Sequence, residues 1–191
     1  MNSQSLLDRA ARLQLSPYVP WEPTARQLAF LMLDQQEALY GGAAGGGKTA
    51  ALLMAALQYT HVLGYSALLL RRTFPDLNQP KGLVPLAKDW LGGKGPRWTA
   101  HNQWMFPSGG LLQFGYLQYE DDKFRYQGSE YQFIGFDEVT QFTETQYRYL
   151  FSRLRRPTGL EVPLRIRAAS NPGGIGHDWV KQRFLVEGKQ A

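Results

Sequence analysis

A cluster of glycines followed by lysine and threonine constrains the fold of this chain more than any other feature of its sequence. Residues 42–49 are Gly-Ala-Ala-Gly-Gly-Gly-Lys-Thr and match the pattern G-x-x-x-x-G-K-[ST]. An apolar segment at 37–40 precedes the cluster and predicts a buried strand, and an Ala/Leu-rich segment at 50–62 follows it and favours a helix. A strand, a glycine-rich turn and a helix in this order are typical of a phosphate-binding loop.

The residue types of this loop suit a nucleotide. Glycines let successive backbone N–H groups turn toward phosphate oxygens, and the N-terminus of the following helix adds a positive end. Lys48 is expected to contact the β- and γ-phosphates, and the Thr49 hydroxyl to bind Mg²⁺. The expected nucleotide-binding residues of the loop are Gly42, Ala43, Ala44, Gly45, Gly46, Gly47, Lys48, Thr49 and Ala50.

Two consecutive carboxylates end a second apolar segment. Residues 132–136 predict a buried strand, and Asp137 and Glu138 follow it directly. Open α/β sheets bind ligands at the carboxyl ends of their strands, so we expect both carboxylates beside the loop. Asp137 is suited to hold Mg²⁺ opposite Thr49, and Glu138 to act as general base on the attacking water. Taken alone, the Asp137–Glu138 pair is also compatible with a solvated strand end. The combination of the pair with the phosphate-binding loop favours the catalytic role.

The rest of the chain alternates strands with helices. Further strands are expected at 66–71 and 164–169, and further helices at 6–15, 24–34, 76–90 with a break near Pro80 to Pro85, 143–155 and 177–186. Aromatic residues on both sides of the turn at 107–110 predict an antiparallel β-hairpin over 98–116, with the aromatics in its core. We therefore expect one α/β domain over 1–191: a three-layer P-loop NTPase fold whose mostly parallel central sheet is flanked by helices, plus the antiparallel hairpin.

Composition excludes several classes of protein. The chain has no cysteine, which excludes disulfides, Cys-ligated zinc and a thiol nucleophile. No apolar run is long enough to span a bilayer and the N-terminus lacks a signal-peptide pattern, so a cytoplasmic setting is expected. His101 and His177 lack metal-binding spacing and are interpreted as surface or capping residues. The net charge of +5 is compatible with a polyanionic partner and equally with a mildly basic enzyme.

With these motifs in place, the chain resembles the ATPase domain of phage terminase large subunits. The resemblance rests on the loop and the Asp-Glu strand in combination with three further segments: Arg-Arg-Thr-Phe-Pro-Asp-Leu at 71–77, Tyr-Gln-Gly-Ser-Glu at 126–130 and Ala-Ala-Ser-Asn-Pro at 168–172. It implies an adenine-side segment at 1–35, in which Gln27 contacts adenine and Tyr18 or Trp21 stacks on it, and an ATPase core at 36–191. It also implies that Ser170 and Asn171 sense the γ-phosphate. The alternative for Gln27 is an ordinary surface residue, and the alternative for Asn171 is a turn-forming Asn-Pro pair.

The resemblance leaves the catalytic arginine open. Some terminases have an arginine within the loop, where this chain has Ala44, so we expect the charge from elsewhere, including a neighbouring subunit. Arg125 is the first candidate, followed by Arg71, Arg72 and Arg153, with salt bridges or a solvated surface as the alternative for each. The following basic residues are interpreted as a surface for DNA, portal or a subunit, or as a solvated edge: Arg153, Arg155, Arg156, Arg165, Arg167, Lys181 and Arg183.

The function that the resemblance implies is ATP hydrolysis that powers the movement of double-stranded DNA into a viral procapsid. The implied cofactors are ATP and Mg²⁺. The implied partners are DNA, portal protein, the small terminase subunit and further copies of the chain, in the cytoplasm of an infected host. The family's C-terminal nuclease domain has no counterpart in these residues, so no DNA cleavage is expected. A helicase- or recombinase-like motor and a non-catalytic nucleotide-binding scaffold are the alternatives.

Overall fold

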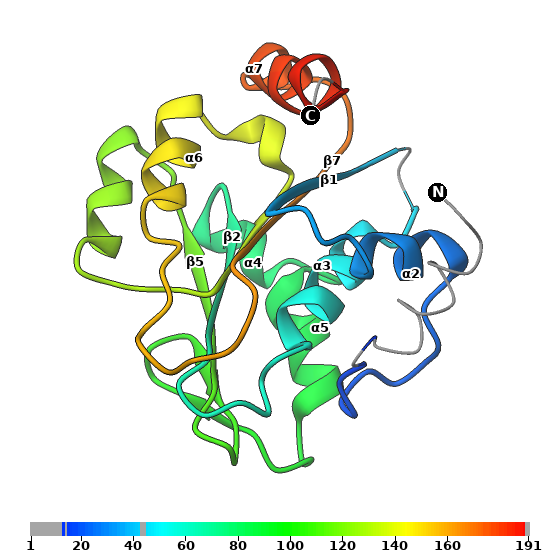
Figure 1. Ribbon diagram of the computed structural model, residues 1–191, viewed down its shortest axis with the longest axis vertical. Coiled ribbons are helices and arrows are strands. Elements are labelled where there is room, and N and C mark those ends of the chain that lie inside the picture. Colours follow the sequence, from blue (N-terminus) through cyan, green and yellow to red (C-terminus); the bar gives the residue numbers. More distant parts are fainter. Residues whose placement is uncertain (1–12, 14, 43–44, 190–191) are drawn as a thin grey trace.

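Seven strands form one mixed sheet in the computed structural model, which describes residues 13, 15–42 and 45–189 (Figure 1). In chain order the strands are β1 (Glu37–Gly41), β2 (Ser66–Arg71), β3 (Arg97–Thr99), β4 (Gln103–Met105), β5 (Leu111–Tyr116), β6 (Phe133–Asp137) and β7 (Arg165–Ser170). Their order in the sheet is β1-β7-β6-β2-β5-β4-β3. The first five strands in this order pair in parallel, and β4 and β3 continue the sheet in antiparallel pairs.

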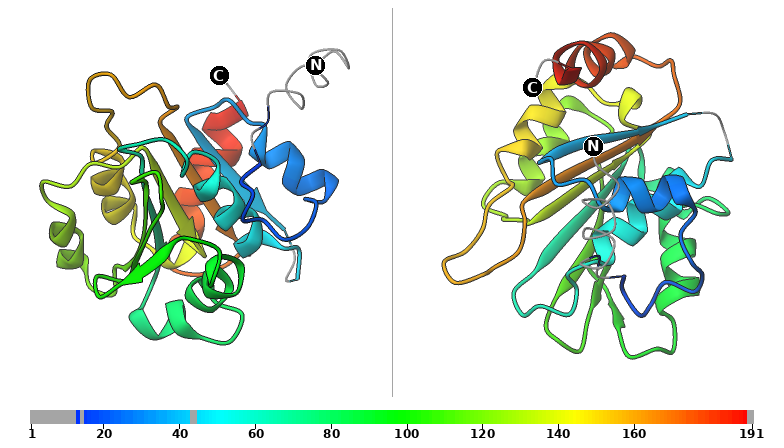
Figure 2. Two further views of the ribbon diagram at one scale, coloured as in Figure 1. Left: turned by 90° about the horizontal axis from the view of Figure 1, so that it is seen from below. Right: turned by 45° about the vertical axis from the view of Figure 1, so that its right-hand side comes forward.

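Helices cover both faces of the sheet (Figure 2). The helices are α2 (Ala25–Leu31), α3 (Lys48–Leu57), α4 (Phe74–Asn78), α5 (Leu83–Leu91), α6 (Glu144–Phe151) and α7 (His177–Lys181), with 3₁₀ turns η1 (Glu120–Tyr126), η2 (Val139–Gln141) and η4 (Glu187–Lys189) and a π-helical stretch η3 (Gln182–Val186). Apolar residues of β2 alternate between two cores. Ala67 and Leu69 belong to the core under α3 and α5, and Leu68 and Leu70 to the core under α6. This alternation produces the expected three layers.

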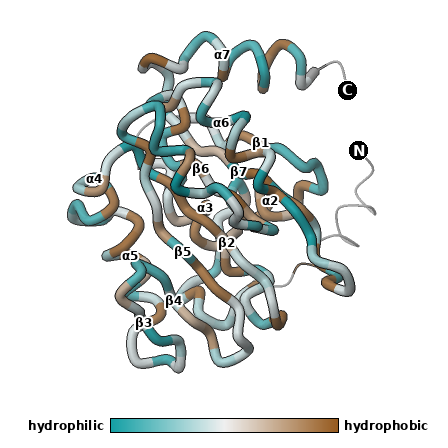
Figure 3. Tube along the Cα trace, turned by 90° about the vertical axis from the view of Figure 1, so that its left-hand side faces the viewer, coloured by the Kyte–Doolittle hydropathy of each residue, from teal (hydrophilic) through white to brown (hydrophobic). Residues whose placement is uncertain are grey.

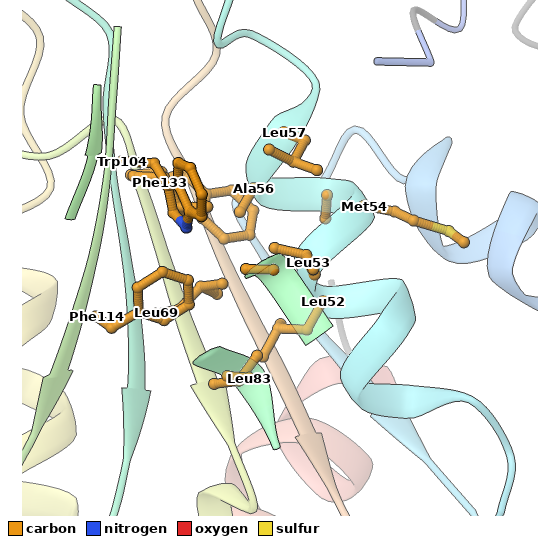
Figure 4. Packing of buried hydrophobic residues seen from close by; sticks show 14 of the residues in the cluster. Leu52, Leu53, Met54, Ala56, Leu57, Leu69, Leu83, Trp104, Phe114 and Phe133 are labelled. Atoms are coloured by element: carbon orange, nitrogen blue, oxygen red, sulfur yellow. The ribbon is translucent and has the colours of Figure 1, made fainter. Parts of the chain in front are cut away.

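The apolar strands are enclosed by polar surface segments, as the hydropathy of the trace shows (Figure 3). Helix α3 is buried over nearly its whole length, and its leucines pack against Leu69, Phe114 and Phe133 of the sheet (Figure 4). Gly135 in β6 permits this close packing, because a Cβ atom there would overlap the Leu69 side chain and lie 3.2 Å from that of Leu52. A larger residue at 135 would therefore push α3 away from the sheet.

The predicted α/β class and element order are confirmed, with local differences. The hairpin has a third strand, β3, and its strand β5 also joins the main sheet alongside β2. The helix expected at 143–155 ends at Phe151, because the backbone of Arg153 and Arg155 instead bonds to Tyr131 on the neighbouring chain segment. The helix expected at 24–34 ends at Leu31. The helix expected at 6–15 falls almost entirely outside the described residues.

The expectation that Arg167 lies on a basic surface is wrong. Its side chain is buried, with 1% of the residue exposed, and donates to the carbonyl groups of Leu33, Gln35 and Ile166 at 2.7, 2.9 and 3.0 Å. These bonds fasten the segment between α2 and β1 to β7. Burial lowers the pKa of Arg167 to about 9, which leaves the guanidinium protonated at neutral pH. Arg183 is likewise engaged, in a two-pronged ion pair with Glu37 at 2.7 and 2.9 Å.

We predict that Arg167→Met destabilises the chain by about 2–4 kcal/mol, because it leaves one buried and two partly buried carbonyl groups without this donor. Urea unfolding followed by circular dichroism measures this loss. Arg156→Met, at an exposed arginine, serves as the control and is expected to change the unfolding free energy by less than about 0.5 kcal/mol. Equal stability of the two variants would contradict a structural role for Arg167.

Candidate active site

The loop between β1 and α3 has the backbone of a phosphate cradle. Gly42, Gly45 and Gly47 have φ angles of 142°, 81° and 67°, in the region that favours glycine. A Cβ atom added to Gly42 or Gly45 would meet nothing within 4 Å, so the space beside these glycines is open. Gly47 caps the N-terminus of α3, which places the positive end of the helix at the loop. The expected ligands Ala43 and Ala44 lie outside the described residues, and Ala50 lies in the first turn of α3.

Two side chains stabilise this loop by donating hydrogen bonds to the backbone carbonyl groups of two consecutive glycines. The Tyr40 hydroxyl donates to the Gly46 carbonyl at 3.3 Å, and the Gln27 amide donates to the Gly47 carbonyl at 3.0 Å. The oxygen of the same amide accepts from the backbone N–H of Thr24 at 2.9 Å, in the capping box of α2. The Gln27 amide therefore links α2 to the loop, and its predicted contact with adenine stays a prediction. Tyr40 was not anticipated, although it directly precedes the loop.

Lys48 is buried at the start of α3 and its ammonium group is aimed at the sheet edge. Its Nζ donates to the Gly42 carbonyl at 3.1 Å and to Oδ1 of Asn171 at 2.8 Å. The ammonium group thus lies between the phosphate loop and the end of β7. A phosphate oxygen held by the loop would be within reach of this charge.

Thr49 and Asp137 face each other across the site. The Thr49 hydroxyl lies 3.3 and 3.2 Å from the two carboxylate oxygens of Asp137, and Nη1 of Arg71 lies 3.5 Å from one of them. Burial is the main cause that raises the pKa of Asp137, to about 6, while Arg71 opposes the shift. A buried anion beside a hydroxyl suits a hard cation such as Mg²⁺, which takes one or two protein oxygens and completes its shell with phosphates and water. Within the described residues no cluster of three acidic, histidine or cysteine side chains offers an alternative metal site.

Glu138 directly follows this strand with a left-handed backbone, at φ 55° and ψ 55°. Such a conformation is uncommon for a residue with a side chain and is found preferentially at functional sites. Its carboxylate accepts hydrogen bonds from Asn171, through the backbone N–H and the side-chain amide, and from the Ser170 hydroxyl, each at 3.3 Å. The amide of Asn171 therefore bridges Lys48 and Glu138.

The Ser170 hydroxyl connects the site to the C-terminal helix. It lies 2.8 Å from the hydroxyl of Thr140, and the Thr140 carbonyl accepts from the N–H of Gly176 at 2.7 Å, immediately before α7. A cavity of about 220 Å³ separates β1 and the Ser170–Asn171 segment from α7. Thr140 was not anticipated, because a threonine two residues after a carboxylate has no recognisable pattern.

The arginine candidates occupy different places. Arg125 pairs with Asp122 at 2.9 Å and lies over the Tyr116 ring, with no described contact to the phosphate loop or the two carboxylates. Arg72 donates to the Leu117 carbonyl and to Gln146. Among the described arginines, Arg71 is the one paired with a carboxylate of the site. Tyr18 packs against Phe106, and Trp21 packs against Trp90.

Comparison with known proteins identifies the family of this chain. Residues 39–172 match the family described as "Terminase large subunit, T4likevirus-type, N-terminal". The chain belongs to this terminase family. No curated protein sequence matches it significantly.

Solved large terminases share the fold of this terminase chain. The large terminase of a thermophilic bacteriophage matches with a TM-score of 0.67 and 16% identity, over 88% of this chain and 44% of that protein. The HK97 bacteriophage large terminase matches with a TM-score of 0.67 and 12% identity, over 95% of this chain and 41% of that protein. The chain thus spans less than half the length of these terminases. None of the helices in its described part is long and apolar enough to cross a membrane.

We predict that Gln27→Ala weakens the binding of ADP and GDP by the same factor, about three- to tenfold, because the lost hydrogen bond holds the loop rather than the base. Fluorescence titration with labelled nucleotides measures both affinities. Gln35→Ala, at an exposed glutamine of the following turn, is the matched control. Loss of ADP affinity with GDP affinity retained would instead support the contact with adenine.

Proposed function

We propose that this terminase domain binds ATP at residues 42–49 and hydrolyses it, with Glu138 as general base. The observation that carries the proposal is the meeting of an ammonium, a hydroxyl, two carboxylates and an amide at one sheet edge, from Lys48, Thr49, Asp137, Glu138 and Asn171. In support, the large terminase of the thermophilic bacteriophage, which shares the fold, was solved in complex with ADP and with ATP-gamma-S.

The phosphates of ATP fit the loop, where backbone N–H groups and Lys48 offset their negative charge. Thr49 and Asp137 would hold Mg²⁺, which supplies further positive charge to the phosphate oxygens when it is bound. Arg71 favours the ionised form of Asp137, the form that binds a cation. The γ-phosphate would then lie toward Asn171, because the Lys48 ammonium points to that side chain.

Glu138 is suited to take a proton from the water that attacks the γ-phosphorus, as the bond to the ADP oxygen breaks. A carboxylate offers about four acceptor positions, and the hydrogen bonds to Glu138 are all at the long end of the usual range. Replacing one of these hydrogen bonds with a hydrogen bond from water therefore requires little free energy. Asn171 and Ser170 keep the carboxylate directed into the site.

We infer from the family that hydrolysis drives double-stranded DNA into a procapsid. The chain of contacts from Glu138 through Ser170 and Thr140 to α7 supports this role, because it links the site of hydrolysis to a peripheral helix. The proposed partners are DNA, portal protein, the small terminase subunit, a nuclease domain in the full-length protein and further copies of the chain, in the cytoplasm of the host. An arginine from a neighbouring copy is part of this proposal, with Arg125 as the first candidate.

We expect Glu138→Gln to lower the rate of phosphate release from Mg-ATP about 10²- to 10⁴-fold, because the amide cannot accept the proton. Steady-state phosphate release measures the rate, and titration with labelled ATP is expected to show affinity within about threefold of the native chain. The exposed Glu144→Gln is the control for the loss of one negative charge. Undiminished turnover in Glu138→Gln would assign the base elsewhere. ATP binding without turnover in the native chain would favour either a scaffold or a motor that needs further parts.

A further inference from the structure

A second cation faces the phosphate loop from α2. A cavity of about 510 Å³ lies between α2, the end of β1 and the loop, and Arg26 and Lys48 both line it together with Tyr40 and loop glycines. No acidic side chain is among its lining residues. A cavity that combines two cations with open glycine backbone suits a polyanion.

The guanidinium of Arg26 is available for such a ligand. Arg26 is exposed, and within the described residues its side chain has no hydrogen bond, ion pair or ring contact. The first turn of α2 contains no acidic residue that would compete for it. Among the described residues, by contrast, five other arginines are in ion pairs with acidic side chains, namely Arg71, Arg125, Arg148, Arg155 and Arg183.

Gln27, the residue after Arg26, fixes the position of α2 relative to the loop. Gln27 donates to the Gly47 carbonyl at 3.0 Å, and a Cβ atom at Gly47 would lie 2.7 Å from the Gln27 amide nitrogen. This direct contact keeps the first turn of α2 against the loop. Arg26 and Ala29, three residues apart, share the helix face that lines the cavity.

Arg26 lines the cavity between α2 and the loop, and it does not line the neighbouring cavity beside α7. Ser170, Asn171 and Thr140 line a different cavity, beside α7. Leu39, Gly41 and Gly42 line both cavities, so the two cavities adjoin at the end of β1. Lys48, in turn, reaches Asn171, which marks the side of the γ-phosphate.

We propose that Arg26 binds the phosphates of the nucleotide that are not transferred, the α- and β-phosphates common to ADP and ATP. The proposal rests on the proposed binding of nucleotide at residues 42–49. Arg26 then contributes to affinity in the ground state and not to the hydrolytic step, because it does not line the cavity that contains Ser170 and Asn171. The arginine side chain is matched to this task by its planar array of donors.

The test compares the binding and turnover of nucleotides in Arg26 variants. In Arg26→Ala, the dissociation constants of labelled ADP and ATP are expected to rise together by about tenfold, the size of one charge-assisted hydrogen bond. The KM for ATP is expected to rise by a similar factor while kcat stays within about twofold. Arg26→Lys retains the charge and is expected to restore at least about a third of the native affinity.

Two control variants separate this inference from the proposed function. Arg97→Ala removes one exposed arginine from β3 at the far edge of the sheet and is expected to bind ADP like the native chain. Lys48→Ala removes the lysine of the loop and is expected to abolish binding. Native affinity in Arg26→Ala, with binding lost in Lys48→Ala, would overturn the role of Arg26 and leave the proposed function standing.

Two further outcomes would also be decisive. A fall in kcat of Arg26→Ala by about tenfold or more, with unchanged affinity for ADP, would place Arg26 at the transferred phosphate and overturn the proposal. If the native chain bound neither ADP nor ATP, the proposed function would fail and the role of Arg26 with it. Circular dichroism of each variant shows whether a loss of binding reflects a loss of fold.

Discussion

The parallel alignment of β1, β7 and β6 is the constraint on which the rest of the site depends. Gly41 pairs with Ser170 and Asp137 pairs with Ala169, so the three strands end almost level with one another. Each strand is followed by residues with a chemical role: the phosphate loop, Glu138 and Asn171. Because parallel strands present their carboxyl ends at the same edge, segments about 90 and 30 residues apart in the chain meet within hydrogen-bonding distance.

The groups that meet at this edge depend on each other for their orientation. The amide of Asn171 accepts from Lys48 and donates to Glu138, so the side chain that directly follows β7 links the residues that follow β1 and β6. Asp137 is buried between Arg71 and Thr49, which stabilise its charge against the cost of desolvation. The left-handed backbone of Glu138 turns its side chain toward Asn171 while η2 continues toward α7.

Local patterns in the sequence were sufficient to predict most of the parallel strands, the position of the loop and the position of the Asp137–Glu138 pair at a strand end, but not the way in which the hairpin joins the sheet. The loop has a fixed spacing of glycine, lysine and threonine, and the apolar segments have the length and composition of buried strands. Such local patterns could not predict contacts between segments that are distant in the sequence. In the sequence Arg167 is one of several arginines near the end of the chain, and its burial is explained only by the α2–β1 segment, whose carbonyl groups accept from its guanidinium. Thr140 and Tyr40 act through single hydrogen bonds, which leave no periodic signal.

The close approach of α3 to the sheet at Gly135 has a consequence for how related sequences can differ. The space that a side chain at 135 would need is occupied by Leu69 of β2, by Leu52 of α3 and by Phe133 of β6 itself. A substitution at 135, 69 or 52, on three different elements, changes the room available at the other two positions. In an alignment of relatives, a larger residue at 135 is therefore expected to occur together with smaller residues at 52 or 69, as a correlated substitution among three separate elements.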